Sequence, residues 1–255
     1  MFARAAVLAP RSVAVSIDPV GASARTRSVM MEHPSEAGSA TPAIAAGLKQ
    51  QAAQEIRRRV FAGEMKPGSK VDQDAIAHRL GISKLPVREA LIALEGEGVI
   101  KTIPRRGAFV ANLDREDIRD HYWMLGVISG LAAERAAARL SRQELNQLSD
   151  IATRMESVNA TSFQEDLNFC FHRLINRAAG SRRLISELKL LSSAIPTGFY
   201  DSHPDWIASG LRDHREILDA LIARSAGMAR TLTEGHFLRG GNQAVALLDG
   251  RGFWS

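Results

Sequence analysis

A short interruption, Gly81-Ile82-Ser83, separates two helical patterns and constrains the fold more than any other feature of the sequence. Aliphatic residues recur at helical spacing on both sides of it, at residues 72–80 and at residues 84–96. Two short helices joined by a turn that contains glycine form the helix-turn-helix arrangement. We therefore expect a helix-turn-helix in this part of the chain.

Further elements are predicted on both sides of this pair. Ile56, Val60 and Phe61 recur at helical spacing and predict an earlier amphipathic helix that ends before Gly63. Downstream, the apolar runs at residues 99–103 and 108–111 flank a basic tip and predict a short hairpin. The predicted order is helix, helix, turn, helix and hairpin.

Several motifs punctuate these elements: Pro67-Gly68, Pro86-Val87-Arg88-Glu89-Ala90-Leu91, Leu94 with Glu97-Gly98, and Arg106-Gly107 with Phe109-Val110. In this order they resemble the winged helix-turn-helix of the GntR family of bacterial transcription regulators. The resemblance implies that double-stranded operator DNA is a partner and that the third helix and the hairpin tip contact it. The predicted DNA-binding residues are Lys84, Leu85, Pro86, Arg88, Arg105, Arg106 and Gly107.

The chain departs from the family pattern at the positions that read DNA. Many members carry Arg followed by Thr where Lys84 and Leu85 stand, and a basic residue where this chain has Asp74. The operator sequence therefore does not carry over from the family. An ordinary solvated basic face is the alternative interpretation, but placement on a helix-turn-helix with a wing favours DNA.

Charge and cysteine content agree with this interpretation. The chain has 255 residues and a net charge of +5, and residues 43–113 hold twelve Lys and Arg against seven Asp and Glu. A basic module suits a polyanionic partner. The single cysteine, Cys170, excludes an intramolecular disulfide, and no apolar run is long enough to span a bilayer. We expect a cytoplasmic, nucleoid-associated bacterial protein with no membrane partner.

The composition changes along the chain and predicts four segments. Residues 1–41 are rich in Ala, Ser, Arg and Pro, and we expect them to be disordered. A transit peptide, a start codon placed too far upstream of Met30 and Met31, and a basic arm that touches DNA stay open as explanations. The winged helix-turn-helix is predicted at residues 42–113, an all-helical domain at 114–249 and a tail at 250–255.

The all-helical domain is predicted as a bundle of six helices with a pocket between them, which makes the fold class mainly α. Asp114 with Asp117 predicts the start of a long helix, and Ser141 with Glu144 has the capping-box spacing of the next. The remaining helices are expected at residues 161–179, 182–195, 204–223 and 228–248.

Three histidines of this domain occupy positions where core residues are expected. Asn168 and His172 lie four residues apart on one helical face, and His214 and His236 follow on later helices. Imidazole nitrogens are good ligands for zinc and similar divalent ions, and an amide oxygen is a weaker one. Taken singly, each histidine is an ordinary hydrogen-bonded residue.

Three motifs change that interpretation: Asn168-Phe169-Cys170-Phe171-His172-Arg173-Leu174, Asp213-His214-Arg215-Glu216-Ile217-Leu218 and Thr233-Glu234-Gly235-His236. In order and spacing they resemble the FCD effector domain of the FadR subfamily, and six helices point to its VanR-like branch. The resemblance implies a divalent metal ion bound by Asn168, His172, His214 and His236, with coordination positions left open. Asn168 replaces the usual aspartate, which favours an anionic effector. In many members of the family an Arg and a Glu face the pocket, and Leu125 and Ser129 stand at the corresponding positions of this chain.

Two classes of function follow. The first is a metabolite-responsive regulator, expected to be a repressor, that binds a pseudo-palindromic operator as a homodimer and takes a small carboxylate as effector. The second is a metal-dependent hydrolase that uses the three histidines. No His-Glu-x-x-His pattern supplies a general base, and Asp166 and Asp213 are candidates by proximity only. The predicted winged helix-turn-helix favours the regulator.

Overall fold

The computed structural model describes residues 40–157, 161–196, 199 and 204–254, and it describes only the backbone at 40–45, 161–163 and 204–205. Helix dominates these residues, and one two-stranded sheet accompanies it. The predicted disordered extension lies outside the described residues as far as residue 39, and residues 40 and 41 are already helical. No helix in the described ranges is long and apolar enough to cross a membrane.

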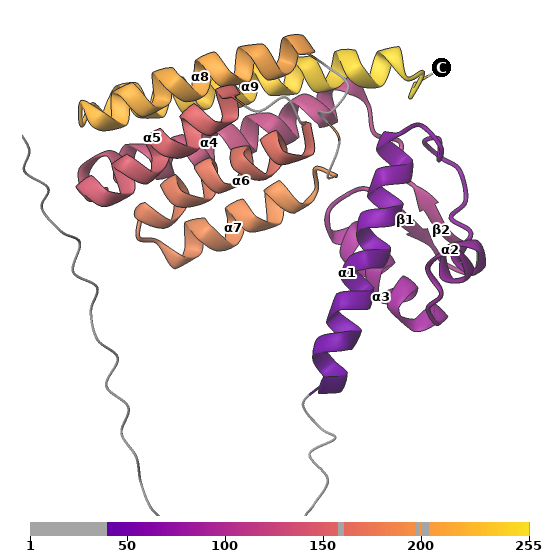
Figure 1. Cartoon of the computed structure of the whole chain (residues 1–255). Helices are drawn as coiled ribbons and strands as arrows, with labels where there is room; N and C mark the ends of the chain where they lie inside the picture. Colours follow the sequence, from indigo (N-terminus) through magenta and orange to yellow (C-terminus); the bar gives the residue numbers. More distant parts are fainter. Residues whose placement is uncertain (1–39, 158–160, 197–198, 200–203, 255) are drawn as a thin grey trace, which may run out of the picture. The chain divides into compact units, whose positions relative to one another are not determined.

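The head consists of α1 (Ala40–Phe61), α2 (Gln73–Leu80), α3 (Lys84–Gly96), β1 (Ile100–Ile103) and β2 (Gly107–Val110). Figure 1 shows α1 as the long indigo helix beside α3 and the hairpin. The two strands are antiparallel, and their register pairs Ile100 with Val110 and Ile103 with Gly107. This order of elements is the predicted helix-turn-helix with a wing.

Local chemistry explains the turn between α2 and α3. The Asp72 carboxylate accepts hydrogen bonds from the backbone N–H groups of Asp74 and Ala75 at the start of α2. Gly81 ends the helix with a left-handed φ of 64°, which glycine adopts without strain, and its N–H returns to the carbonyl groups of Ala77 and His78. These two caps fix where α3 begins.

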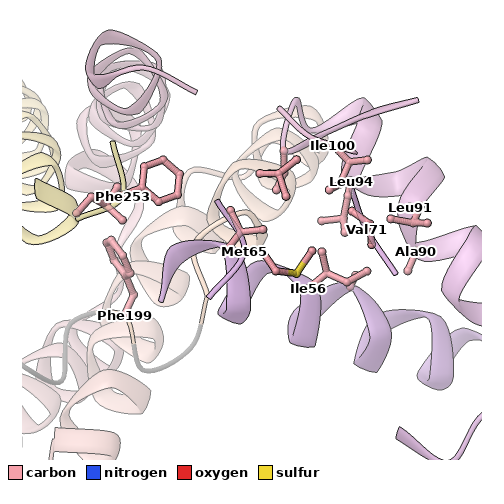
Figure 2. Packing of buried hydrophobic residues seen from close by; sticks show 14 of the residues in the cluster. Ile56, Met65, Val71, Ala90, Leu91, Leu94, Ile100, Phe199 and Phe253 are labelled. Atoms are coloured by element: carbon pink, nitrogen blue, oxygen red, sulfur yellow. The ribbon is translucent and has the colours of Figure 1, made fainter. Parts of the chain in front are cut away.

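The core of the head lies between α1, α3 and the hairpin. Figure 2 shows Ile56, Leu94 and Ile100 turned toward one another. Ile56 and Leu94 are fully buried, and Ile100 is 2% exposed. Burying side chains of this size stabilises the fold by roughly 1.5–3 kcal/mol each. The inner face of α3 is therefore committed to the core, and only its outer face is free to bind a partner.

The helical domain consists of α4 (Arg115–Arg139), α5 (Arg142–Ser157), α6 (Thr161–Ala178), α7 (Arg182–Ser193), α8 (Pro204–Ile222) and α9 (Ala226–Gly250). Six helices in the described residues agree with the prediction. The predicted caps are also present: Asp114 and Asp117 form a capping box at α4, and Ser141 and Glu144 bond each other's backbone N–H at α5.

The last helix differs from the prediction at both ends. It begins at Ala226 rather than residue 228, because the break falls at Arg224, which has a left-handed φ of 57°, and Gly227 lies inside the helix. It also continues to Gly250. Just beyond it, Phe253 is only 1% exposed and belongs to the hydrophobic core.

Glycines let α4 and α9 approach closely. A Cβ atom at Gly130 would lie 2.6 Å from Glu234 Cγ, and one at Gly241 would lie 2.9 Å from Tyr122 Cβ. Side chains larger than hydrogen would separate the helices at these points. The close approach packs the face of α9 that carries Glu234 and Gly241 against α4.

Candidate functional site

The outer face of α3 is the first candidate site. Lys84, Leu85 and Arg88 are exposed at its N-terminal end, and Leu85 retains 64% of its accessible surface. Pro86 is buried in the first turn of the helix, where proline is well tolerated.

An ion pair links α3 to α2. Lys84 Nζ lies 2.7 Å from Asp74 Oδ1, and both side chains are more than half exposed. Arg88 forms no ion pair with any residue that the structure describes. Arg88 is thus the cation of this helix that is free to bind a partner. Lys84 must break its ion pair with Asp74 before it can bind one. The two departures from the family pattern, Lys84 and Asp74, are in contact.

The tip of the wing is a strained basic turn. Arg106 N–H donates to the Ile103 carbonyl over 3.0 Å, which closes a four-residue turn with Pro104 and Arg105 at its centre. Arg105 has a φ of 63°, where this type II turn normally has glycine. Arg105 and Arg106 are exposed, and half-buried Gly107 follows with a φ of 103°. Both guanidinium groups are therefore presented at the tip.

The three predicted histidines come together in the helical domain. His172 of α6, His214 of α8 and His236 of α9 each offer a ring nitrogen, and these nitrogens all lie within 4.8 Å of one another. The Nε2 atoms of His172 and His214 are 3.2 Å apart. His214 is 4% exposed, and its buried Nδ1 has no hydrogen-bond partner among the described residues.

Asp213 and Arg239 orient the third histidine. His236 Nδ1 is 3.1 Å from Asp213 Oδ2, and Arg239 Nη2 donates to Asp213 Oδ1 over 2.6 Å. Burial raises the pKa of Asp213, but the hydrogen bonds from His236 and Arg239 outweigh burial and hold the pKa below its usual value. The carboxylate fixes the tautomer of His236 and leaves Nε2 to face the cluster.

One pair of nitrogens in the cluster has the spacing that a shared metal ion requires. Two nitrogens that share one tetrahedral zinc ion lie about 3.3 Å apart, because each zinc–nitrogen distance is about 2.0–2.1 Å. The Nε2 atoms of His172 and His214 match this spacing at 3.2 Å. Asn168 lines the cavity that these histidines border, which has a volume of about 100 Å³.

Burial keeps two of the three histidines in the form that binds metal. Burial, and then the charge of His236, lowers the pKa of His172 from 6.5 to about 3. The pKa of His214 is also lowered well below 6.5 by burial and by the two neighbouring histidines. Both imidazoles are therefore neutral at physiological pH, which metal coordination requires.

The metal-free protein is expected to lose stability as the pH falls below 6.5. The unfolded chain then protonates His172, while the folded chain keeps it neutral down to about pH 3. Each such histidine lowers the free energy of unfolding by about 1.4 kcal/mol per pH unit in that window. Denaturant unfolding of chelator-treated protein measures the slope. His172→Gln should reduce the slope, and an unchanged slope would contradict the prediction.

The other predicted positions lie outside this arrangement. Asp166 is exposed, and both oxygens of Asp213 already accept hydrogen bonds, so neither acts as a general base next to the cluster. Leu125 and Ser129 are both 2% exposed and are absent from the lining of the cavity. Sequence reasoning missed the aromatic wall of the cavity, to which Trp206 belongs.

Comparison with known proteins identifies both parts of the chain. Residues 48–110 match the bacterial regulatory proteins of the gntR family, and residues 120–239 match the FCD domain. An uncharacterised HTH-type transcriptional regulator of Mycobacterium tuberculosis is 29% identical over 203 residues, which cover 75% of this chain and 83% of the relative. The HTH-type transcriptional repressor RspR of Escherichia coli K12 is 26% identical over 196 residues, covering 73% and 85%.

Solved structures share the fold. Escherichia coli McbR/YncC superimposes with a TM-score of 0.60 at 19% identity, covering 78% of this chain and 97% of that one. A putative transcriptional regulator GntR from Rhodococcus sp. RHA1 gives 0.53 at 20% identity, covering 78% and 98%. These likenesses bear on the fold alone. The family matches identify a regulator and exclude the hydrolase alternative. The chain belongs to the gntR family of DNA-binding transcription regulators and combines its winged helix-turn-helix with an FCD domain.

Proposed function

We propose that this regulator is a metabolite-responsive repressor that binds a pseudo-palindromic operator as a homodimer. Its effector is a small carboxylate, bound at a divalent metal ion, zinc or a similar one, in the helical domain. The ion is held by Asn168, His172, His214 and His236. The convergence of three imidazoles beside a cavity is the observation that carries this proposal.

The protein groups around the ion have separate tasks. His172 and His214 supply neutral nitrogens, and Asp213 holds His236 in the required tautomer. When bound, the ion supplies a positive charge and open positions for an anionic donor. Because Asn168 is a neutral ligand in place of the family's aspartate, it leaves that charge less compensated. This favours an effector that carries a carboxylate.

The head is proposed to read DNA with the outer face of α3 and to hold the backbone with the wing. The Arg88 guanidinium suits the two acceptors of guanine, and the exposed Leu85 side chain suits the methyl group of thymine. Lys84, Arg105, Arg106 and the backbone at Gly107 contact phosphates. The protein then acts in the cytoplasm, at the nucleoid.

Exposed apolar side chains support a dimer. Trp123 and Met124 of α4 retain 54% and 43% of their surface, and Leu190 of α7 retains 53%. Such residues are enriched in protein interfaces. One recognition helix covers only a few base pairs, so two heads related by twofold symmetry give the specificity that a single head lacks.

The experiment is to select fragments from random DNA with the purified, zinc-loaded chain and to determine the mass of the complex by light scattering. Enriched fragments should share an inverted repeat with half-sites about one helical turn apart, bound by two chains. Enrichment without a shared inverted repeat, or one chain per fragment, would overturn the proposal. Addition of candidate carboxylates to the complex of the protein with the selected operator then tests whether the effector releases the DNA.

Arg88→Ala is expected to weaken binding to the selected operator by about 1–3 kcal/mol and to weaken binding to random DNA much less. The reason is that Arg88 is exposed and free of ion pairs in the described structure, at the end of α3 that enters the major groove. Fluorescence anisotropy on both DNAs measures the difference. Arg106→Ala is the matched control at the wing, and it should weaken both about equally. Equal losses for Arg88→Ala would reduce Arg88 to a phosphate contact.

A further inference from the structure

The cavity beside the histidines has a mixed polar and apolar lining. Apart from the histidines, α6 contributes polar residues to it: Gln164, Glu165 and Asn168. The rest of the lining is largely aromatic and aliphatic and includes Tyr122 of α4, Trp206, Ile207 and Leu211 of α8, and Phe237 of α9. An effector therefore meets a wall of rings and alkyl groups once its donor group has reached the histidines.

The lining carries no cation apart from the histidines. None of the described residues around the cavity is a lysine or arginine, and the acidic residue Glu165 is among them. Two arginines of α9 are engaged with acidic partners: Arg239 pairs with Asp213, and Arg230 pairs with Glu134 and Glu234. The stretches 158–163, 197–198 and 200–205 contain no lysine or arginine in the sequence.

This charge distribution limits what the cavity can bind. One carboxylate at the metal position is compensated, because the imidazole and amide ligands are all neutral. A second carboxylate on the same molecule would lose water against apolar walls, with no cation to pair with. An alkyl chain or ring in that place gains from burial instead.

The size of the cavity agrees with a small acid. Its volume of about 100 Å³ is smaller than the roughly 150 Å³ that encloses benzene in a protein core. A carboxyl group and a short chain fill it, and the remainder of a longer molecule extends toward the open side.

We propose that the effector carries a single carboxylate on an apolar body, and that this cavity rejects dicarboxylates and tricarboxylates. The inference rests on the proposed effector site at the metal, and it adds the charge class of the molecule. Charge selection comes from the absence of a cation in the described lining, and affinity for the body comes from Tyr122, Trp206 and Phe237.

The test is calorimetric titration of the zinc-loaded full chain with two matched pairs, butyrate with succinate and hexanoate with adipate. Within each pair the carbon number is the same, and only the far end changes from methyl to carboxylate. The monocarboxylate should bind at least about tenfold more tightly. Succinate or adipate binding as tightly as its partner would overturn the inference, and so would failure of both monocarboxylates to bind at millimolar concentration.

Two variants separate this inference from the proposed function. Ile207→Lys places a cation in the lining and should bring adipate to within about threefold of hexanoate. Ile222→Lys adds the same charge outside the cavity, at a side chain of α8 that is 51% exposed, and should leave the wild-type preference intact. His214→Ala should abolish hexanoate binding if the metal site is correct. Undiminished binding by that variant would sink the metal-site proposal, whereas loss of preference in the wild type would sink only the charge class.

Discussion

His214→Ala is expected to remove most of the bound metal from the purified protein. His214 is 4% exposed, and its Nε2 lies 3.2 Å from that of His172, so it stands at the centre of the cluster. Two imidazoles and an amide are a poor site for zinc, which takes at least three good ligands in most proteins. The affinity should fall by more than the roughly 10–100-fold that is lost when a residue hydrogen-bonded to a metal ligand is removed. Elemental analysis and competition with a chelator measure the loss.

Two further variants should show a partial loss of metal binding and no loss, respectively. Asp213→Asn keeps a hydrogen-bonding group beside His236 but removes the charge, and it should weaken metal binding by about 10–100-fold. His78→Ala removes an exposed histidine of α2 and should change nothing. Retention of a full complement of metal by folded His214→Ala would show that the ion, if bound, lies elsewhere.

The grouping of the three histidines was predictable because helical periodicity and family spacing are properties of the sequence. Asn168 and His172 share a face because four residues make about one turn, and that relation needs no tertiary structure. The pairing of Asp213 with His236 did need it, because these residues come from α8 and α9 and meet only through packing. The adjacency of Asp213 to His214 suggested a general base, and the hydrogen bonds of Asp213 show a positioning role instead.

Helix ends were predictable where a side chain caps the backbone. Asp114 and Ser141 form their expected capping boxes because both partners are local. The start of α9 was predicted two residues late because Gly227 resembles a breaker, whereas the actual break is the left-handed Arg224. Nothing in the residue type of Arg224 indicates a left-handed φ, which the surrounding chain imposes.

The largest unpredicted feature of the head is a buried ion pair between α1 and the end of α3. Arg57 Nη2 lies 2.6 Å from Glu97 Oε1, and Arg57 Nε donates to Glu97 Oε2 over 2.9 Å. The two side chains are 7% and 9% exposed. Forty residues separate them, and Arg57 stands in a run of three arginines that all look solvated in the sequence. Only the packing of the folded chain distinguishes Arg57 from the two arginines that follow it.

Glu97→Ala is expected to destabilise the head by about 3–5 kcal/mol, because it leaves the Arg57 guanidinium buried without a counterion. Chemical denaturation followed by circular dichroism measures the loss. Glu64→Ala is the matched control, because Glu64 also pairs with arginines, Arg58 and Arg59, but is 41% exposed. Its loss should cost about 1 kcal/mol or less.

The double variant Arg57→Met, Glu97→Leu tests whether the stability lost in Glu97→Ala comes from the uncompensated charge of Arg57 or from lost packing. Replacement of both charges by apolar groups of similar size should recover most of the stability lost in Glu97→Ala, because the uncompensated charge is then absent. If the double variant is as unstable as the single one, the cost lies in packing at the end of α3 rather than in charge. Operator binding distinguishes a further role: a stable double variant that binds DNA poorly would show that the ion pair sets the angle at which α3 meets the groove.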